Sequence, residues 1–415
     1  MRVPPSGERW LVVTEEEVLP ADTGGRVDHR GLVHAALAAG IAVRLLVPTK
    51  EALDLGAYAA AFPGVPVAPL PRDPRRRLHA GRLPYVVSSR ALPASVLGGQ
   101  VAAARVAGGW GATAVVCWSV RSAAVGTALA SALGLPLLVR CHNLDSQYFR
   151  DLATGARGPR RVAYRLEAAR LAAYERRLDR GSTVSAFADI SAIEARAHRT
   201  RTAQCVLHVP TFALEAAPPV LGGVAARRAV LFLGSLDVET NQQALGLLLG
   251  DVWPLVLAAV PGARLQVVGR RPTDALRATV AALAGAGVTL HEDVPDVAPF
   301  LAGAAVAVNP VLTGAGVNVK LVQAMAAGCA CVSTPAGVAG LPLEAGRDLL
   351  VATGAEAFAG AVAVLLTDAS LRASVAAAGV LAVTAALDPG AALAAITAAL
   401  HGDRDRAAQA AQSER

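Results

Sequence analysis

The sequence predicts an α/β fold in two domains, each built on a parallel β-sheet. Its 415 residues are too many for one ordinary hydrophobic core and suit two domains of about 200 residues each. Short buried apolar runs alternate with helical patterns along the chain, as in successive β-α-β units. Hydrophobic residues make up 54% of the chain and aromatic residues only 4%, so alanine, valine and leucine are expected to form the cores.

A stretch rich in proline and glycine separates two patterned halves. We expect an N-terminal domain over residues 1–215, a linker over 216–228 and a C-terminal domain over 229–386. Residues 387–401 are predicted to form a further helix. The polar residues 402–415 are predicted to be a disordered tail.

In the first half, apolar runs and turn signals alternate regularly. Buried strands are predicted at residues 11–14, 41–47, 112–118, 135–141, 183–187 and 205–209, with helices ending at residue 40 and over 101–108 and 158–180. Residues 63–93 are rich in proline and arginine and lack a sustained period. We interpret them as a long surface excursion, either a solvated loop or a contact surface for an acceptor or a membrane.

The predicted helix over residues 158–180 is strongly basic. Its arginines are Arg160, Arg161, Arg165, Arg170, Arg176, Arg177 and Arg180, placed around Val162, Leu166, Ala169, Ala173 and Leu178. Two interpretations stay open. The apolar stripe covers a sheet while the arginines face water, or the helix lies on an anionic membrane.

The second half repeats the strand-and-helix pattern. Strands are predicted at residues 229–233, 263–268, 288–291, 304–309, 329–333 and 349–351, and helices over 241–257, 317–327, 356–366, 371–386 and 391–400. The cores of both halves are therefore expected to lie on the faces of parallel sheets.

Charge and cysteine content narrow the functional classes. The net charge is +7, and the basic excess lies in the first half, which suits an acidic acceptor, an anionic membrane surface or a solvated face. Nucleic acid is disfavoured because no aromatic-basic motif accompanies the charge. The five cysteines have no zinc-site spacing and no CxxC, so we expect buried reduced thiols.

The location predicted from the sequence is cytoplasmic. No apolar run is long enough to span a bilayer without a charge or a glycine cluster, and the first residues lack the basic-then-apolar order of a signal peptide. A peripheral contact of the basic N-terminal domain with a membrane remains an open alternative.

One stretch, residues 310–340, combines the features of an anion site. Gly314 and Gly316 allow backbone to approach a ligand closely, and a helical pattern follows, ending at Gly328. Lys320 and Gln323 lie in the first turns of that helix. Unpaired N–H groups, a positive helix end and a lysine together favour a phosphate.

Other candidates lie at the ends of predicted strands, where open α/β sheets place their sites. The diglycine Gly24-Gly25, with Arg26 beside it, separates the first strand from the first helix and allows a phosphate to approach. His142 follows the strand at 135–141, either as a functional group or as a hydrogen-bonded core histidine. Arg270 follows the strand at 263–268.

The stretch from Gly314 to Gly328 resembles the donor-binding element of the GT-B glycosyltransferases, specifically the retaining glycosyltransferase family 4. The family pattern is Gly-Ser/Thr-Gly-x-x-x-Lys-x-x-Glu-Ala-Met-Ala-x-Gly, and this chain reads Gly-Ala-Gly-Val-Asn-Val-Lys-Leu-Val-Gln-Ala-Met-Ala-Ala-Gly. Gln323 stands where the family usually carries a glutamate that takes the ribose hydroxyls of the donor. A glutamine accepts hydrogen bonds only through its carbonyl and carries no charge.

The resemblance implies a fold of two Rossmann-like, doubly wound parallel-sheet domains that face each other across a cleft, with the helix at 387–401 crossing back to the N-terminal domain. It implies transfer of a sugar from a nucleotide-sugar donor to a hydroxyl acceptor with retention, by front-face substitution, without a metal or another cofactor. The expected acceptor is a small natural product, a lipid or a polysaccharide precursor.

The resemblance also assigns roles to residues. His142, which would meet the sugar or the acceptor, and Lys320, which would hold the leaving diphosphate, are the catalytic candidates. The donor-binding candidates are Gly24, Gly25, Arg26, Ser235, Asn241, Arg270, Val294, Gly314, Ala315, Gly316, Val317, Asn318 and Gln323. After Gly234 the family often has basic residues for the diphosphate, whereas this chain has Asp237, Glu239 and Asn241.

Three other functions compete with this one. A non-catalytic or auxiliary GT-B protein that binds sugar nucleotides is favoured by Gln323 and by the few basic residues after Gly234. A GT-B epimerase is disfavoured because the sequence offers no carboxylate-histidine set for water chemistry. A nicotinamide dehydrogenase is disfavoured because no GxGxxG follows the first strand.

Overall fold

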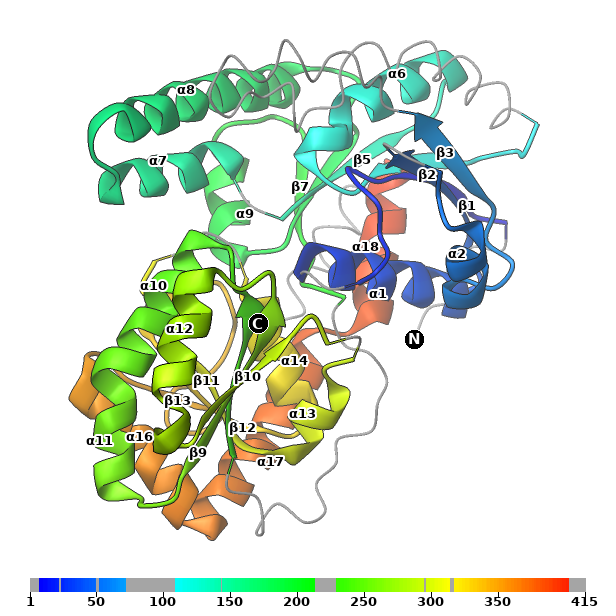
Figure 1. The fold of residues 1–415 in the computed structure, drawn as a ribbon. Helices are drawn as coiled ribbons and strands as arrows, with labels where there is room; N and C mark the ends of the chain where they lie inside the picture. The colour runs from blue at the N-terminus through cyan, green and yellow to red at the C-terminus, as the bar shows by residue number, and fades with distance from the viewer. Residues whose placement is uncertain are drawn as a thin grey trace. The chain divides into compact units, whose positions relative to one another are not determined.

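The computed structural model describes residues 7–21, 24–49, 52–71, 109–142, 144–212, 229–294, 296–313 and 317–402. The chain forms two compact units, Met1–Phe212 with Asp388–Arg415, and Ala213–Leu387 (Figure 1). Each unit is an α/β structure on one parallel sheet, so the predicted fold class is confirmed. The predicted linker at 216–228, the predicted helix at 101–108 and the tail beyond residue 402 lie outside the described residues.

The first unit has a parallel sheet in the order β3-β2-β1-β4-β5-β6-β7. Its strands are β1 Arg9–Val13, β2 Ala42–Thr49, β3 Val67–Pro71, β4 Ala114–Cys117, β5 Leu137–Cys141, β6 Ala186–Asp189 and β7 Cys205–His208. The interpretation of residues 63–93 as a surface excursion was wrong for β3, an edge strand that tolerates prolines because only one of its sides pairs.

The helices of the first unit cover both faces of this sheet. They are α1 Gly24–Ala38, α2 Leu55–Ala61, α6 Ala123–Leu133, α7 Asp145–Gly155, α8 Gly158–Arg180, α9 Ala192–Arg199 and α18 Pro389–Leu400, with a short 3₁₀ helix η3 at Val120–Ser122. Alternate strand residues face opposite sides: Trp10 and Val12 pack with α1 and α18, and Leu11 and Val13 pack with α6 and α9.

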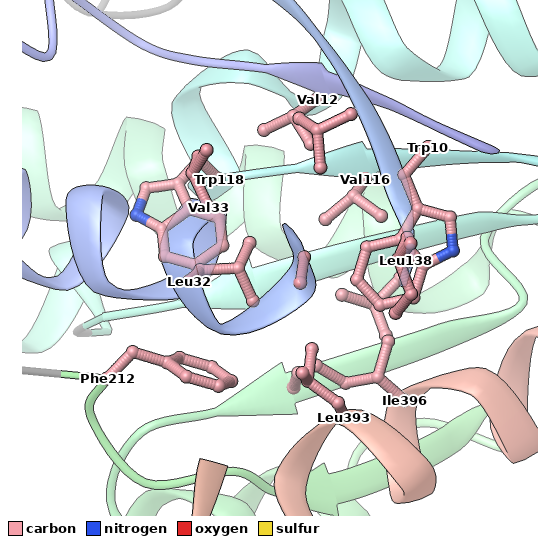
Figure 2. Packing of buried hydrophobic residues seen from close by; sticks show 14 of the residues in the cluster. Trp10, Val12, Leu32, Val33, Val116, Trp118, Leu138, Phe212, Leu393 and Ile396 are labelled. Atoms are coloured by element: carbon pink, nitrogen blue, oxygen red, sulfur yellow. The ribbon is translucent and has the colours of Figure 1, made fainter. Parts of the chain in front are cut away.

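Helix α18 completes one of these two cores. It packs against α1 and against β5, β6 and β7, although the whole second unit separates it from them in sequence. Leu393 and Ile396 of α18 lie with Trp10, Leu138 and Val116 in one cluster (Figure 2). The first unit therefore includes chain from both sides of the second unit.

Helix α8 corrects one expectation. Its buried face is Tyr164, Glu167, Ala168, Leu171, Glu175 and Asp179, and it packs mainly along α7. The expected stripe was wrong, because Val162 and Leu166 are 58% and 60% exposed. Buried carboxylates, which an apolar pattern does not reveal, define the inner face of this helix.

The second unit has a parallel sheet in the order β10-β9-β8-β11-β12-β13. Its strands are β8 Ala229–Ser235, β9 Arg264–Arg270, β10 Val288–Glu292, β11 Ala304–Asn309, β12 Ala330–Ser333 and β13 Leu350–Val351. The sequence patterns predicted all six strands, with ends that differ by at most two residues.

The helices of the second unit also form two layers. They are α10 Glu239–Leu247, η5 Leu248–Val252, α11 Trp253–Ala259, α12 Asp274–Ala282, η6 Ala284–Ala286, α13 Ala298–Gly303, α14 Val319–Ala326, α15 Pro335–Val338, α16 Ala355–Thr367 and α17 Ala369–Ala386. Helices α10, α11 and α16 share a core on one face of the sheet, and α13, α14 and the end of α17 share one on the other. The expected continuous helix at 241–257 is interrupted by η5, a π-helical turn that periodicity does not predict.

Two helical stretches, Glu239–Ala259 and Ala369–Leu400, are long and apolar enough to cross a membrane by length and composition alone. In this fold their apolar residues include Leu248, Trp253, Val383 and Leu393, which belong to the buried cores. All five cysteines are free, and four of them are buried, in agreement with the prediction of reduced thiols.

Candidate functional site

Each sheet has one point where the strand order reverses. In the second unit it lies between β8 and β11, and in the first unit between β1 and β4. Helices from adjacent strands leave such a point on opposite faces, which opens a crevice at the carboxyl ends of the strands. These two crevices are where an open α/β sheet binds ligands.

The crevice of the second unit lies at the ends of β8 and β11. Gly234 and Gly269 bring β8 and β9 close together there, since a Cβ on Gly269 would lie 2.0 Å from the carbonyl oxygen of Gly234. Asn309, the last residue of β11, is buried and donates to Ser333 and to the carbonyl of Gly337. The same carbonyl accepts from Asn318, the residue before α14.

Lys320 reaches across this crevice. It is the second residue of α14, and its Nζ donates to Oδ1 of Asn241 at 2.6 Å. Asn241 lies in the first turn of α10, on the other face of the sheet, and its amide also donates to the carbonyl of Ser235. The structure therefore brings together three residues that the sequence analysis selected separately, Ser235, Asn241 and Lys320.

The ammonium of Lys320 is largely buried and has no counter-ion among the residues that the structure describes. No carboxylate of the described residues lies within ion-pair distance of its Nζ, which is 5.1 Å from the ring centroid of Phe232. Burial lowers the pKa of Lys320 from 10.5 to about 8. A buried cation with only a neutral amide and an aromatic face as partners is poised to take an anion.

The other candidates of this unit surround the same edge. Gln323 is half-buried one turn after Lys320, and Val317 and Asn318 directly precede α14. Arg270 ends β9 beside Ser235, and Val294 lies just beyond β10 with its side chain against the core below α14. Gly314, Ala315 and Gly316 lie outside the described residues.

The sequence analysis missed a polar pair at this edge. Arg271 and Asp293 both have positive φ angles, 52° and 50°, and the Arg271 amide donates to the Asp293 carboxylate. The Arg271 guanidinium pairs with Asp237 at 3.0 Å, so this acidic residue after Gly234 has a structural partner. Arg271 follows β9, whereas its partner Asp237 follows β8. No local sequence pattern indicates this pairing.

In the first unit, His142 lies just after β5 and contacts a buried ion pair. Its Nε2 is 3.0 Å from the carboxylate of Asp28, which Arg140 also binds through two nitrogens at 2.8 and 3.1 Å. Asp28 and Arg140 are fully buried, while the His142 side chain is 17% exposed. Sequence analysis found His142 but neither member of the ion pair.

The diglycine of the first unit forms the start of α1. Gly24 and Gly25 are the first two residues of that helix, and a Cβ on Gly25 would meet nothing within 4 Å. The Arg26 guanidinium donates to Glu16 at 3.0 Å and to the carbonyl of Pro20. Among the described residues, there is open space beside Gly25, and Arg26 is held to the loop after β1.

A second group at the carboxyl edge of the first sheet went unnoticed in the sequence. Arg121, after β4, binds Asp145 through two nitrogens at 2.8 and 2.7 Å and lies 3.5 Å from Glu15, which also accepts from Ser119. Burial alone lowers the pKa of Arg121, but the two carboxylates raise it above its ordinary value. These paired charges lie where β1 and β4 end, at the point where the strand order reverses.

A third group, Cys141, Asp189 and His198, has ligand atoms close enough together to hold a metal ion. Its chemistry fits an ion triad better. His198 lies 3.0 Å from Asp179 through Nε2 and 3.0 Å from Asp189 through Nδ1, so both nitrogens donate. Burial alone lowers the pKa of His198, but the bonds to the carboxylates raise it to about 9, so the imidazolium fills the place of a cation.

Residues 227–368 match the family model described as "Glycosyl transferases group 1". The match covers the strands of the second unit and its helices from α10 to α16, including Ser235, Asn241, Arg270, Lys320 and Gln323, and ends before α17.

Among curated proteins, the chain is 30% identical over 135 residues to the "uncharacterized 44.6 kDa protein in cps region" of Klebsiella pneumoniae. The aligned part is 31% of this chain and spans about a third of that relative, 35% of its length.

Solved structures match both units. HepE of Anabaena, crystallised with UDP and glucose, superposes with a TM-score of 0.65 at 14% identity, over 95% of this chain and 99% of its own. Sucrose-phosphate synthase of Thermosynechococcus elongatus gives 0.66 at 17% identity, over 97% and 100%. TarM gives 0.70 at 8% identity, over 94% and 98%. These likenesses support the GT-B fold predicted from the sequence.

Proposed function

We propose that the protein is a glycosyltransferase that moves a sugar from a nucleoside-diphosphate sugar to a hydroxyl acceptor. The observation that carries the proposal is the buried ammonium of Lys320, which has no carboxylate within ion-pair distance among the described residues. A departing diphosphate supplies the negative charge that these residues do not offer to the ammonium. Positioned electrostatics of this kind is commonly the largest contribution to such a reaction.

The finer parts of the proposal follow from the same site. We propose that the reaction retains the anomeric configuration, in the manner of glycosyltransferase family 4, with the leaving phosphate oxygen taking the acceptor proton. Lys320 supplies positive charge where a metal ion otherwise would, so we propose a reaction without metal or other cofactor. The proposed acceptor is a small natural product, a lipid or a polysaccharide precursor.

The donor is held, in this proposal, by Lys320, Asn241 and the backbone at Ser235. Gln323 holds the ribose through its side-chain amide. Arg270 and Val294 lie at the base, and the loop from Gly314 to Gly316 lies at the phosphates. In the first unit, Gly24, Gly25 and Arg26 face the diphosphate, and His142 contacts the transferred sugar or the acceptor hydroxyl.

The test is donor binding by Lys320→Met, measured by titration calorimetry with UDP and UDP-glucose, because HepE is described with both. A charge-assisted hydrogen bond contributes about 1.5–3 kcal/mol, so we expect at least a tenfold loss of affinity. We expect the melting temperature without ligand to stay the same or rise, since removing the ammonium relieves its desolvation.

The matched control is Arg264→Ala, which removes one positive charge from the exposed start of β9. This residue lies at the amino-terminal ends of the strands, whereas the site lies at their carboxyl ends. The substitution should leave affinity unchanged. Equal affinity of Lys320→Met and the unmodified protein for every nucleoside diphosphate tested contradicts the site.

A non-catalytic protein that binds sugar nucleotides is the alternative, and Gln323 in place of the usual glutamate favours it. Measuring turnover distinguishes the two functions. A transferase releases free nucleoside diphosphate when an acceptor is present, whereas a binding protein gives the same thermal stabilisation by the donor without release. Release of a free-sugar epimer would instead indicate an epimerase.

We further propose a cytoplasmic protein that contacts anionic membrane surfaces through α8. Its five unpaired thiols suit a reducing compartment. Val162 and Leu166 are exposed one turn apart, with exposed arginines, Arg161 and Arg165, beside them. An exposed basic helix face with apolar residues binds anionic lipid.

Co-sedimentation with vesicles tests the membrane proposal. Binding is expected with phosphatidylglycerol, to weaken at 0.5 M salt and to fall severalfold when Arg161 and Arg165 are replaced by glutamate. Arg264→Glu makes a change of the same kind on the second unit and should bind normally. Equal binding of all three proteins contradicts a role for α8.

A further inference from the structure

We propose that Asp28 is the positioning residue of His142: it holds the imidazole through Nε2 and so fixes the orientation of the ring. The inference rests on the proposed function, in which His142 contacts the transferred sugar or the acceptor hydroxyl. It adds a residue that neither the sequence pattern nor the resemblance identified.

The hydrogen bonds on Asp28 fix its protonation state. Its Oδ1 accepts from Thr211 Oγ1 at 2.7 Å, Phe212 N at 2.6 Å and Arg140 Nη2 at 3.1 Å, and its Oδ2 from Arg140 Nε at 2.8 Å. Four donors thus point at one carboxylate, which has about four lone-pair positions, and His142 Nε2 lies 3.0 Å from Oδ2. No position remains for a proton on Asp28.

The electrostatics agree with the geometry. Burial alone raises the pKa of Asp28, but the charge of Arg140 and the hydrogen bond from His142 outweigh it and hold that pKa well below its ordinary value. An ionised carboxylate only accepts hydrogen bonds. The nitrogen of His142 that faces it must therefore carry the hydrogen, so Nε2 is the donor.

The carboxylate is itself held rigidly. Arg140 also donates to the carbonyls of Val209 and Pro210, and its guanidinium lies 5.2 Å from the ring centroids of Trp118 and Phe212. Asp28 thus joins α1 to the end of β5 and to the segment after β7. Because Asp28 is fully buried and links three segments, its carboxylate cannot move as an exposed side chain does. It therefore serves as a fixed anchor for His142.

Aromatic rings pack beside the imidazole. The centroids of His29 and Trp118 each lie 5.8 Å from that of His142, at interplanar angles of 55° and 58°. Burial, followed by the nearby His142, holds the pKa of His29 well below its ordinary value, so this neighbour is uncharged. Trp118 belongs to the packed core beside Leu32 and Phe212 (Figure 2). The ring of His142 is therefore oriented by packing as well as by its bond to Asp28.

The consequence concerns the chemistry of His142. With Nε2 held by Asp28, the plane of the imidazole is fixed relative to the end of β5. A ring with a fixed plane meets a sugar or acceptor hydroxyl in one orientation. The inference therefore makes Asp28 the residue that sets how His142 meets a substrate hydroxyl.

Nitrogen NMR on histidine-labelled protein tests the anchor without requiring turnover. The chain has eight histidines, and His142→Gln identifies the signal of interest. We expect His142 as the Nε2–H tautomer, with a slowly exchanging proton. An Nδ1–H tautomer, or rapid averaging between the two, overturns the proposal whether or not the protein proves to be a transferase.

Kinetics test the functional half. With donor and acceptor saturating, we expect Asp28→Asn to lower kcat at least tenfold with little change in KM for the donor, but less than twofold in a His142→Ala background. Equal losses in both backgrounds contradict positioning through His142. Thr211→Val removes one bond to Oδ1 and leaves Oδ2 with His142, so this control should keep kcat within twofold and retain the tautomer.

Two outcomes separate this inference from the proposed function. If Asp28→Asn does not fold because Arg140 is left buried without its partner, the tautomer in the unmodified protein still decides the anchor. If UDP and UDP-glucose fail to bind but the Nε2–H tautomer is found, the proposed function fails and the Asp28–His142 contact stands as structure only.

Discussion

At the scale of single residues, Lys320 combines two properties that oppose each other. It is charged at neutral pH, yet burial alone lowers its pKa to about 8. A bound diphosphate favours the ammonium and raises that pKa, so binding above pH 8 is coupled to proton uptake. The same group makes the unliganded protein more stable as pH rises from 8 towards 10.5, because the unfolded chain then holds the extra proton.

Affinity for UDP is therefore expected to depend on pH in a defined window. Between pH 7 and pH 9 we expect it to fall about tenfold, since a shift of one pH unit past the pKa changes the charged fraction tenfold. Titration calorimetry in two buffers of different ionisation enthalpy measures both the affinity and the proton uptake. Lys320→Met should bind weakly at both pH values with a flat profile, and a flat profile in the unmodified protein contradicts this expectation.

Residues of the site differ in how well the sequence predicted them. Lys320 and Gln323 could be found because glycines, a helix start and a lysine lie within a few positions of one another. Asp28 could not, because its partner Arg140 lies 112 positions away and both look like ordinary members of their elements. Contacts that depend on which strands become neighbours carry no local signal.

At the scale of elements, α8 and α9 are joined by the buried triad of Asp179, His198 and Asp189. Both carboxylates accept from one imidazolium, and these bonds raise the pKa of His198 from 6.5 to about 9 against the effect of burial. The folded-state pKa is above the unfolded one, so the stabilisation is fully present below pH 6.5 and is lost as pH rises through 9.

Denaturant unfolding of His198→Gln tests this triad. At pH 6.5 we expect the substitution to lower the free energy of unfolding by about 3 kcal/mol, from a pKa difference of about 2.5 units. The deficit should shrink at pH 9.5, where the unmodified protein has itself lost the charge. A deficit that is the same at both values would mean that His198 contributes packing alone.

Elements were predicted best where apolar residues alone determine them. The strands of both sheets are short buried runs, and all but β3 were found from composition and period. The inner face of α8 was not predicted, because it buries the carboxylates Glu167, Glu175 and Asp179. Glu175 accepts a hydrogen bond from Ser146, and Asp179 accepts one from His198. The π-helical turn η5 was not predicted either.

At the scale of the whole molecule, the two units have separate cores, and α18 belongs to the first. Leu393→Ala removes a side chain that is 1% exposed and should lower the stability of the first unit by about 2–5 kcal/mol. Differential scanning calorimetry should show one transition shifted down by several degrees, while the transition that UDP stabilises stays in place.

Leu381→Ala is the matched control, since Leu381 on α17 is 71% exposed. It should leave both transitions within a degree. A uniform shift of the entire melting curve by Leu393→Ala would show that the units unfold together.

The fold class followed from length, alternating patterns and the resemblance of one segment, and the structural likenesses agree with it over almost the entire chain. What the sequence did not provide is which chemical groups face each other at the two points of strand reversal. Those groups, at the ends of β1, β4, β8 and β11, come together only after the strands have paired.

The position of α18 has a consequence for biosynthesis. The ribosome makes residues 389–400 after every residue of Ala213–Leu387. The first unit, which begins the chain, is therefore the last to complete its hydrophobic core. Until then Leu138, Ala188 and Leu207, on the three strands that α18 packs against, keep an apolar side uncovered while the later unit can already fold. Nascent chains halted before residue 389 are expected to recruit chaperones through that surface, and chains extended past residue 400 and clear of the exit tunnel are expected to release them.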